Sequence, residues 1–278
     1  QQSQNSELAS ALRAGLSAAL TGIPFWGFDI GGFAGPLPTL DLYRRATQLA
    51  CFVPVMQWHS EPDGGQFKEL MPGMDGNNER SPWNIAKAWN CPAFIDEMRF
   101  WHRLRINLLP YLYSTALQCC REYRPMMRPL VYDWQQDPEA VRAEDEYMLG
   151  NSLLAAPLLQ ENQRIRSLWL PEGSWYGLFS RKKYEGGRRI ESDGEERFPV
   201  YLRAGHGLAL KGSAREGLDA DTGNGTGKCE DLHFLLAGET GAERFWDEEH
   251  EAWIRWNKTK VDLEGTDGLH ITWEFVTG

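Results

Sequence analysis

Residues 22–33, with the sequence GIPFWGFDIGGF, decide how the rest of the chain is interpreted. The apolar stretch at 23–27 is typical of a buried parallel strand, and Asp29 and a glycine-rich loop follow it. In the preceding residues, leucines recur every four positions from Leu8 to Leu20, which predicts an amphipathic helix that ends at Gly22. The opening of the chain therefore predicts a helix, a strand and a polar loop in succession.

A second unit of the same kind follows directly. Residues 39–50 have the apolar spacing of a helix, and the apolar residues 51–56 predict a second short strand that leads into 57–59. Residues 94–123 predict a long helix with a kink at Pro110. The alternation of helices and short buried strands indicates parallel α/β architecture.

Polar residues follow both predicted strands. Asp29 comes after the first and His59 after the second, and each has a tryptophan close by in the sequence. In (β/α) barrels the working residues lie at the carboxyl ends of the strands. An ordinary turn residue is the simpler interpretation of one such position, and a satisfied core histidine remains the alternative for His59. Two such positions in consecutive loops favour a binding site.

The pattern changes after about residue 125. Short strand-like runs are separated by Pro and Gly turns, which predicts antiparallel sandwich structure. Residues 204–228 are rich in Gly and polar residues and predict a linker or a long loop. The strand-like runs lie at 128–134, 152–159, 167–170, 197–202 and 269–275.

Composition limits the classes of partner and location. The 29 basic and 39 acidic residues give a net charge of −10, which argues against nucleic-acid binding, because phosphate affinity comes mainly from Lys and Arg. No apolar run approaches the roughly 18 residues of a membrane helix, so no membrane partner is expected. The 5 cysteines lack a metal or redox spacing and are interpreted as free thiols, which favours a reducing, cytoplasmic location over an oxidising one.

With these features in view, the segment at 22–33 resembles the hallmark segment of glycoside hydrolase family 31, the retaining α-glucosidase and α-xylosidase family. Further motifs of the family follow in the expected order, although Gln57 stands where the family usually has Arg. The last motif, at 245–249, matches the family pattern most loosely. These matching segments lie at 52–54, 57–59, 80–83, 125–130, 147–157, 170–175, 198–205 and 245–249.

The resemblance implies a fold class of α/β plus all-β. Residues 1–135 would form the C-terminal quarter of a (β/α)8 TIM barrel, with its seventh and eighth strands. Residues 136–210 would form a proximal antiparallel β-sandwich and residues 211–278 a distal one. An incomplete barrel exposes strand edges, so the resemblance also implies a partner, the N-terminal remainder of the same enzyme.

The family's chemistry uses two carboxylates, a nucleophile and an acid/base, about 5–5.5 Å apart. The resemblance places the nucleophile in a Trp-x-Asp context and the acid/base after a Gly-Asp pair, and neither motif occurs in this sequence. The first three residues resemble the segment that follows Gly-Asp. We therefore expect no catalytic residue in this chain, an inactive isolated chain, and no need for a metal or an organic cofactor.

The resemblance assigns this chain part of the glycone pocket. Asp29 and His59 would bind hydroxyls of the sugar in the −1 position, and Phe33 and, more loosely, Trp26 would form the wall. The implied function is hydrolysis, with retention, of terminal non-reducing sugars from α-linked oligosaccharides or α-glycosides. Trp58 either stacks on substrate or packs in the core, and both interpretations stay open.

Two alternatives remain at this point. The 33 aromatic residues and the missing carboxylates are also consistent with a non-catalytic carbohydrate-binding module or remnant, in which flat rings stack on sugars. In a third interpretation, the sandwich domains have a purely structural role and support the barrel. Separately, residues 219–230 resemble a calcium loop at several positions but lack the usual Gly, and a flexible loop is the main interpretation.

Overall fold

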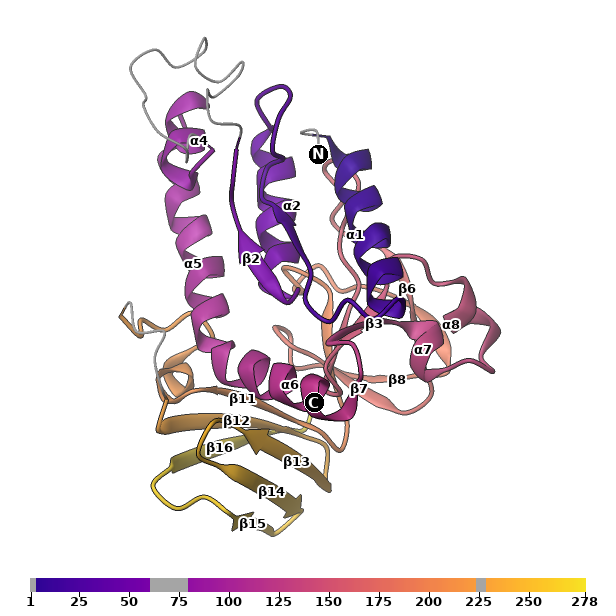
Figure 1. Cartoon of the computed structure of the whole chain (residues 1–278), viewed down its shortest axis with the longest axis vertical. Helices are drawn as coiled ribbons and strands as arrows, with labels where there is room; N and C mark the ends of the chain where they lie inside the picture. The colour runs from indigo at the N-terminus through magenta and orange to yellow at the C-terminus, as the bar shows by residue number, and fades with distance from the viewer. Residues whose placement is uncertain (1–3, 61–79, 224–228) are drawn as a thin grey trace.

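The structure is a computed structural model, and it describes residues 4–60, 80–223 and 229–278. The first region consists of helices that surround two short parallel strands, and it occupies one end of the long axis of the molecule (Figure 1). Its elements, in order, are α1 (Asn5–Leu20), β1 (Gly27–Asp29), α2 (Leu40–Cys51), β2 (Val55–Gln57), α4 (Pro82–Ala88), α5 (Phe94–Asn107) and α6 (Leu109–Glu122).

The parallel pair of β1 and β2 is the centre of this region. Its register places Gly27 opposite Val55 and Asp29 opposite Gln57. Phe28 between them is buried toward the helices, whereas Val55 and Gln57 are exposed on the other face. The strands are shorter and start later than the apolar runs predicted. Residues 23–25 are exposed, and residues 51–53 are buried at the end of α2 and in the turn after it.

A half-buried arginine shapes the turn that leads into β2. Arg105 of α5 donates from Nη1 to the carbonyl oxygens of Cys51 (2.9 Å) and Val53 (2.6 Å), and from Nη2 to that of Pro54 (2.7 Å). Burial lowers the pKa of Arg105 to about 10, which still leaves it charged at neutral pH. One side chain thus binds the carbonyl of the last residue of α2 and two carbonyls of the turn that follows it.

The long helix predicted at 94–123 is two helices. The break falls at Leu108, between α5 and α6, and Pro110 lies in the first turn of α6, where its missing N–H costs no hydrogen bond. Pro110 therefore marks a helix start and not a kink. The break lets α5 pack on α2 while α6 turns toward two distal strands, β11 (Gly207–Lys211) and β13 (Gly241–Trp246).

Antiparallel strands follow α6. A six-stranded sheet has the order β3-β4-β5-β10-β7-β8, and a separate pair joins β6 to β9. The residues predicted as one strand at 128–134 split into the short β3 and a helix. The elements are β3 (Met127–Pro129), α7 (Leu130–Asp133), α8 (Pro138–Arg142), β4 (Tyr147–Leu149), β5 (Leu153–Ala155), β6 (Ser167–Leu170), β7 (Ser174–Gly177), β8 (Lys183–Glu185), β9 (Arg188–Glu191) and β10 (Val200–Arg203).

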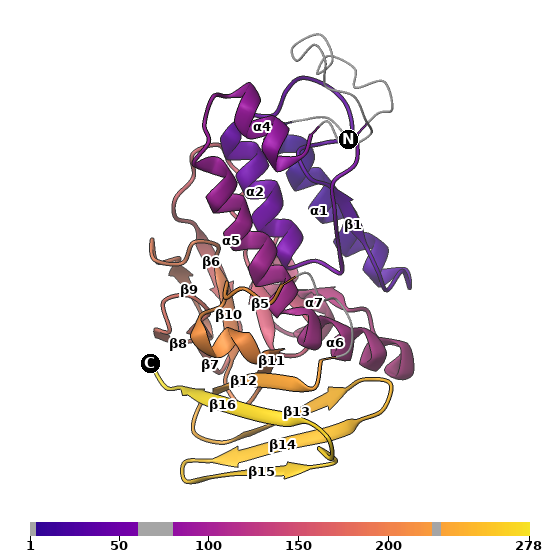
Figure 2. The same cartoon turned by 90° about the vertical axis from the view of Figure 1, so that its left-hand side faces the viewer.

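The last part of the chain forms two three-stranded sheets at the other end of the molecule (Figure 2). Their orders are β11-β12-β16, in which β12 and β16 run parallel, and β13-β14-β15. The elements are β11 (Gly207–Lys211), the 3-10 helix η1 (Gly212–Glu216), β12 (Asp231–Ala237), β13 (Gly241–Trp246), β14 (Glu251–Asn257), β15 (Lys260–Glu264) and β16 (His270–Val276).

The linker predicted at 204–228 is therefore wrong in its first half. All five residues of β11 are buried, and Gly207 N–H donates to the carboxylate of Glu243 on β13 (2.9 Å). Gly and Ala allow this strand to pack closely against its neighbours, and that use of small residues resembles loop composition. Because β3 joins the first sheet and β11 the second, we propose domain boundaries near residues 126 and 205 in place of 135 and 210.

Hydrogen bonds and a shared core connect these parts. Tyr147 on β4 donates through its hydroxyl to the carbonyl of Phe52 (3.0 Å), and Tyr111 on α6 donates to that of Leu149 (2.5 Å). One cluster of buried apolar side chains runs from α1 to β16. The five cysteines form no disulfide, as predicted. No described helix has the length and apolar character needed to cross a membrane.

Glu146, just before β4, makes stability depend on pH. It is 3% exposed, and burial raises the pKa of its carboxyl to about 7 although Arg166 lies beside it. Between about pH 4.5 and pH 7 the unfolded carboxyl has lost its proton while the folded one keeps it, so stability falls as pH rises. Glu146→Gln should remove this loss, up to about 3 kcal/mol, in urea unfolding at pH 5 and pH 7.5. The exposed Glu172→Gln is the control, and equal pH dependence in Glu146→Gln and the unmodified protein would contradict the expectation.

Candidate functional site

The site begins where β1 and β2 end. Parallel strands bring their carboxyl ends to the same edge of a sheet, and here that edge carries Asp29 and Gln57 as register partners. Gln57 Nε2 donates to Asp29 Oδ1 at 3.0 Å. The pairing continues one residue further, because the amide of Ile30 donates to the carbonyl of Gln57 (3.1 Å). Gln57 therefore does not form an ion pair with Asp29, as an Arg at this position would.

His59 and Phe33 meet across the same edge. Their ring centroids are 5.4 Å apart with an interplanar angle of 37°. His59 is exposed and Phe33 and Asp29 are half-buried, so all three can be reached from solvent. Of the four residues that the resemblance predicted, the structure places Phe33 against His59, and Asp29 lies at the end of the neighbouring strand, bound to Gln57.

Trp26 lies apart from them. It precedes β1 and so stands at the strand's amino end, where its ring covers Gly15 of α1 and lies 5.6 Å from the ring of Phe28. A side chain on Gly15 would collide with this ring at 2.5 Å. The geometry indicates packing for Trp26. Trp58 also turns away from the site and meets His102 of α5 edge to face, with 5.6 Å between ring centroids.

The loop that carries Phe33 is held by a buried guanidinium. Arg80 is 2% exposed and donates to four carbonyl groups of this loop. Nη1 bonds the oxygens of Gly31 (3.0 Å), Gly32 (2.8 Å) and Ala34 (3.3 Å), and Nη2 bonds that of Gly35 (2.7 Å). The sequence pointed to Arg80 as part of a motif, but its contacts could not be predicted from that motif.

Two glycines make this wrapping possible. Gly31 and Gly32 both have positive φ angles, +80° and +89°, which side-chain-bearing residues rarely adopt. At Gly31 a Cβ would also lie 2.8 Å from the ring of Tyr43. The Tyr43 hydroxyl in turn donates to the carbonyl of Arg80 (2.7 Å), which fixes the arginine's backbone beside the loop.

The described residues hold no metal-binding constellation. No three His, Cys, Asp or Glu side chains among them lie close enough together to hold an ion. The calcium loop considered at 219–230 falls partly outside the described residues. Within them, Asp221 forms an ion pair with Arg103 and accepts from the amide of Gly223 (2.9 Å).

Removing the Arg80 guanidinium should loosen the loop that carries Phe33. Arg80→Met leaves four carbonyl groups without their charged donor, which should lower the free energy of unfolding by about 2–3 kcal/mol. Amide hydrogen exchange at residues 30–35 should accelerate most. The control is Arg13→Met, because Arg13 is half-exposed in its pair with Glu144 and should change stability by less than about 1 kcal/mol. Unchanged exchange at 30–35 would show that Arg80 does not hold the loop.

Comparison with known proteins covers the same regions. The family model described as "Glycosyl hydrolases family 31 TIM-barrel domain" matches residues 1–115, and "Glycosyl hydrolase family 31 C-terminal domain" matches residues 123–208. An isomaltosyltransferase of Sporosarcina globispora is 34% identical over 237 residues, which are 85% of this chain and 21% of that protein. An α-glucosidase of Saccharolobus solfataricus is 32% identical over 212 residues, 74% of this chain and 27% of the relative.

Solved structures show the same arrangement. The cycloalternan-forming enzyme of Listeria monocytogenes superposes with a TM-score of 0.81 at 30% identity, over 92% of this chain and 24% of that one. An α-xylosidase of Xanthomonas citri covers all of this chain with a TM-score of 0.78 at 26% identity. The chain spans between 21% and 31% of the length of these relatives.

The predicted fold class is thus confirmed: β1 and β2 with their helices are the end of a TIM barrel, and β domains follow. The two family models lie side by side along the chain in the order the motifs predicted, and together they reach from residue 1 to residue 208. This chain belongs to glycoside hydrolase family 31 and corresponds to the C-terminal portion of the family's enzymes.

Proposed function

We propose that this chain is part of a retaining α-glycosidase that hydrolyses terminal non-reducing sugars from α-linked oligosaccharides or α-glycosides. The observation that carries the proposal is the ring contact of Phe33 with His59 at the edge of the barrel segment where Asp29 pairs with Gln57. The nucleophile and the acid/base are supplied by the remainder of the enzyme. In this scheme the described residues bind and orient the glycone and do not react with it.

The chemistry of the cluster suits a pyranose. The Asp29 carboxylate can accept hydrogen bonds from sugar hydroxyls, and Gln57 steadies one of its oxygens. The imidazole of His59 offers one further donor or acceptor, and the Phe33 ring presents an apolar surface beside it. Such contacts hold the anomeric carbon in line for attack, and contacts to hydroxyls that strengthen in the transition state raise the rate.

A second candidate reaction is glycosyl transfer. The isomaltosyltransferase that matches 85% of this chain favours it. Both reactions pass through the same glycosyl-enzyme intermediate, and they differ in whether water or a sugar hydroxyl attacks it. Asp29 and His59 serve either outcome, so product analysis with and without added oligosaccharide acceptor separates them.

The carbohydrate-binding-module alternative finds less support in the tryptophans. The guanidinium carbons of Arg121 on α6 and Arg244 on β13 lie 4.3 Å and 4.0 Å from the centre of the Trp246 ring. Arg244 and Arg255 cover Trp253 in the same way, at 5.1 Å and 4.8 Å. Of the two rings, that of Trp246 is buried and offers no free face for a sugar.

Substitution of Asp29 in the full-length enzyme tests the proposal. Asp29→Asn keeps the size but replaces one acceptor oxygen with a donor, so kcat/KM on an aryl α-glycoside should fall about 10²–10³-fold. His59→Ala should also lower it. Asp262→Asn, on the exposed strand β15, is the control and should leave activity unchanged. Unchanged activity in both Asp29→Asn and His59→Ala would refute the glycone assignment.

The stereochemical course checks the reaction class. Proton NMR of the first product released from an aryl α-glycoside should show the α-anomer, since two displacements at one carbon retain configuration. Appearance of the β-anomer first would exclude a retaining mechanism. The same assay on this chain alone should give no product, and product from the isolated chain would contradict the assignment of the catalytic carboxylates to the remainder of the enzyme.

A further inference from the structure

Gln57 binds the carboxylate that we propose holds the sugar. Its Nε2 donates to Asp29 Oδ1 at 3.0 Å, between the last residues of β1 and β2, which are register partners. A hydrogen bond from an amide to a carboxylate is charge-assisted, so it is stronger than a bond between two neutral groups. Gln57 can therefore influence how Asp29 is oriented, although it lies on the neighbouring strand.

The backbone on both sides of this bond is held by the sheet and the turn that follows it. The amide of Ile30 donates to the carbonyl of Gln57 (3.1 Å), and the amide of Gly32 donates to the carbonyl of Asp29 (2.9 Å). These bonds fix where the Cα atom of Asp29 lies, but they do not fix the rotation of its side chain, which has three staggered positions about the first bond. The bond from Gln57 favours one of these positions.

Burial in this chain does not explain the orientation of Gln57. Gln57 is exposed, as is Val55 on the same face of β2, whereas Asp29 is half-buried. At an exposed position, a protein–protein hydrogen bond replaces bonds to water and adds little to the stability of the fold. The Gln57–Asp29 bond therefore matters more for the direction of the carboxylate than for folding.

The donor at position 57 is also neutral. A guanidinium at this position would form an ion pair with the carboxylate and attract its negative charge, which would weaken the carboxylate as an acceptor for sugar hydroxyls. The amide of Gln57 directs Asp29 without adding a positive charge of its own. A neutral donor thus orients the acceptor and leaves it strong.

We propose, on the basis of the glycone role proposed for Asp29, that Gln57 is a positioning residue of this site. It holds the Asp29 carboxylate in the orientation that meets the sugar hydroxyls, and it acts through that carboxylate and not on the reacting carbon. Contacts to sugar hydroxyls strengthen in the transition state. Loss of the Gln57 donor should therefore lower kcat more than it raises KM.

Two replacements of similar length in the full-length enzyme test this role, with kcat/KM on an aryl α-glycoside given as a ratio to the unmodified enzyme at the same pH. Gln57→Met cannot donate, so its ratio should be about 0.1 or lower at both pH 5 and pH 7.5. Gln57→Glu can keep the bond only while the two carboxyls share a proton, which their like charges favour at acid pH. Its ratio should lie above about 0.2 at pH 5 and fall at least tenfold by pH 7.5.

The matched controls are Gln136→Met and Gln136→Glu, at an exposed glutamine between α7 and α8, and their ratios should stay near 1 at both pH values. The ratio cancels ionisations that the variant and the unmodified enzyme share, and a purely structural role of Gln57 would not make it change with pH. Because Gln57 is exposed, neither replacement should disturb the core, and circular dichroism at both pH values checks that each variant is folded.

A ratio for Gln57→Glu that is the same at both pH values, or a ratio for Gln57→Met within threefold of 1, would overturn the positioning role. Asp29→Asn, assayed in parallel, separates this failure from that of the proposed function. If Asp29→Asn loses activity while Gln57→Met keeps it, the positioning role alone is wrong. If Asp29→Asn keeps full activity, the glycone role of Asp29 is wrong, and the role of Gln57 is wrong with it.

Discussion

The site depends on a buried cation that satisfies carbonyl groups. Arg80 donates hydrogen bonds to four carbonyl groups of the loop after β1, and Arg105 donates to three in the turn before β2. The two guanidinium groups therefore hold the connections at opposite ends of the parallel pair. The strands are only three residues long, so few hydrogen bonds of their own fix where they end. The position of Phe33 therefore depends on the contacts of Arg80 as much as on the sheet.

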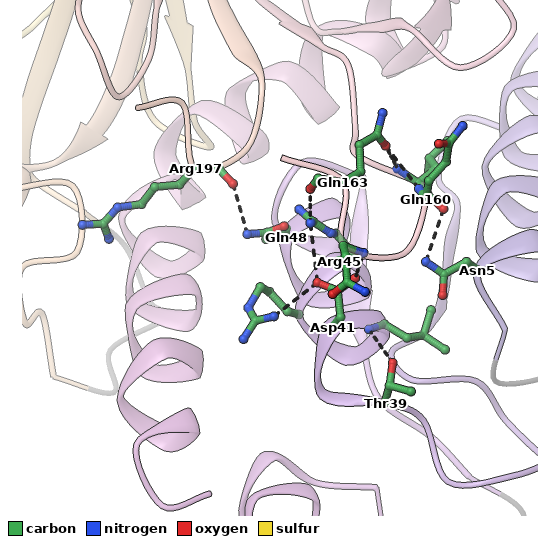
Figure 3. A network of polar contacts seen from close by, with 12 residues as sticks. Asn5, Thr39, Asp41, Arg45, Gln48, Gln160, Gln163 and Arg197 are labelled. Atoms are coloured by element: carbon green, nitrogen blue, oxygen red, sulfur yellow. Dashed lines mark hydrogen bonds and ion pairs between the residues drawn. The ribbon is translucent and has the colours of Figure 1, made fainter. Parts of the chain in front are cut away.

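Helices α2 and α5 also contact the loops at 158–164 and 194–197, away from the strand ends that carry Asp29 and Gln57. Asp41 and Arg45 of α2 contact the loop at 160–163 by a hydrogen bond to the Asn162 amide and to the Gln163 carbonyl (Figure 3). The loop at 160–163 is thus bound to the helix that connects β1 to β2.

Much of this architecture could be predicted from the sequence, and the failures have physical causes. Leucine spacing in α1 and apolar spacing in α2 located those helices, and the order of family motifs located Asp29, Phe33 and His59. Periodicity could not distinguish an apolar turn from a strand, so residues 51–53 were assigned to the wrong element. The small residues of β11 led to its prediction as part of a linker, because Gly and Ala occur both in closely packed strands and in loops. The partners of Arg80 and the packing of Trp26 on Gly15 depend on segments that only folding brings together.

The parallel pairing of β12 with β16 has a consequence for synthesis of the protein. In order of translation, β12 is made well before β16, and the whole β13-β14-β15 meander emerges between them. Until residue 276 is available, β12 presents an open row of backbone donors and acceptors beside an apolar core. The distal unit can therefore complete its fold only after its last strand leaves the ribosome. A stop codon before β16 would leave that edge unpaired and prone to association with other nascent chains.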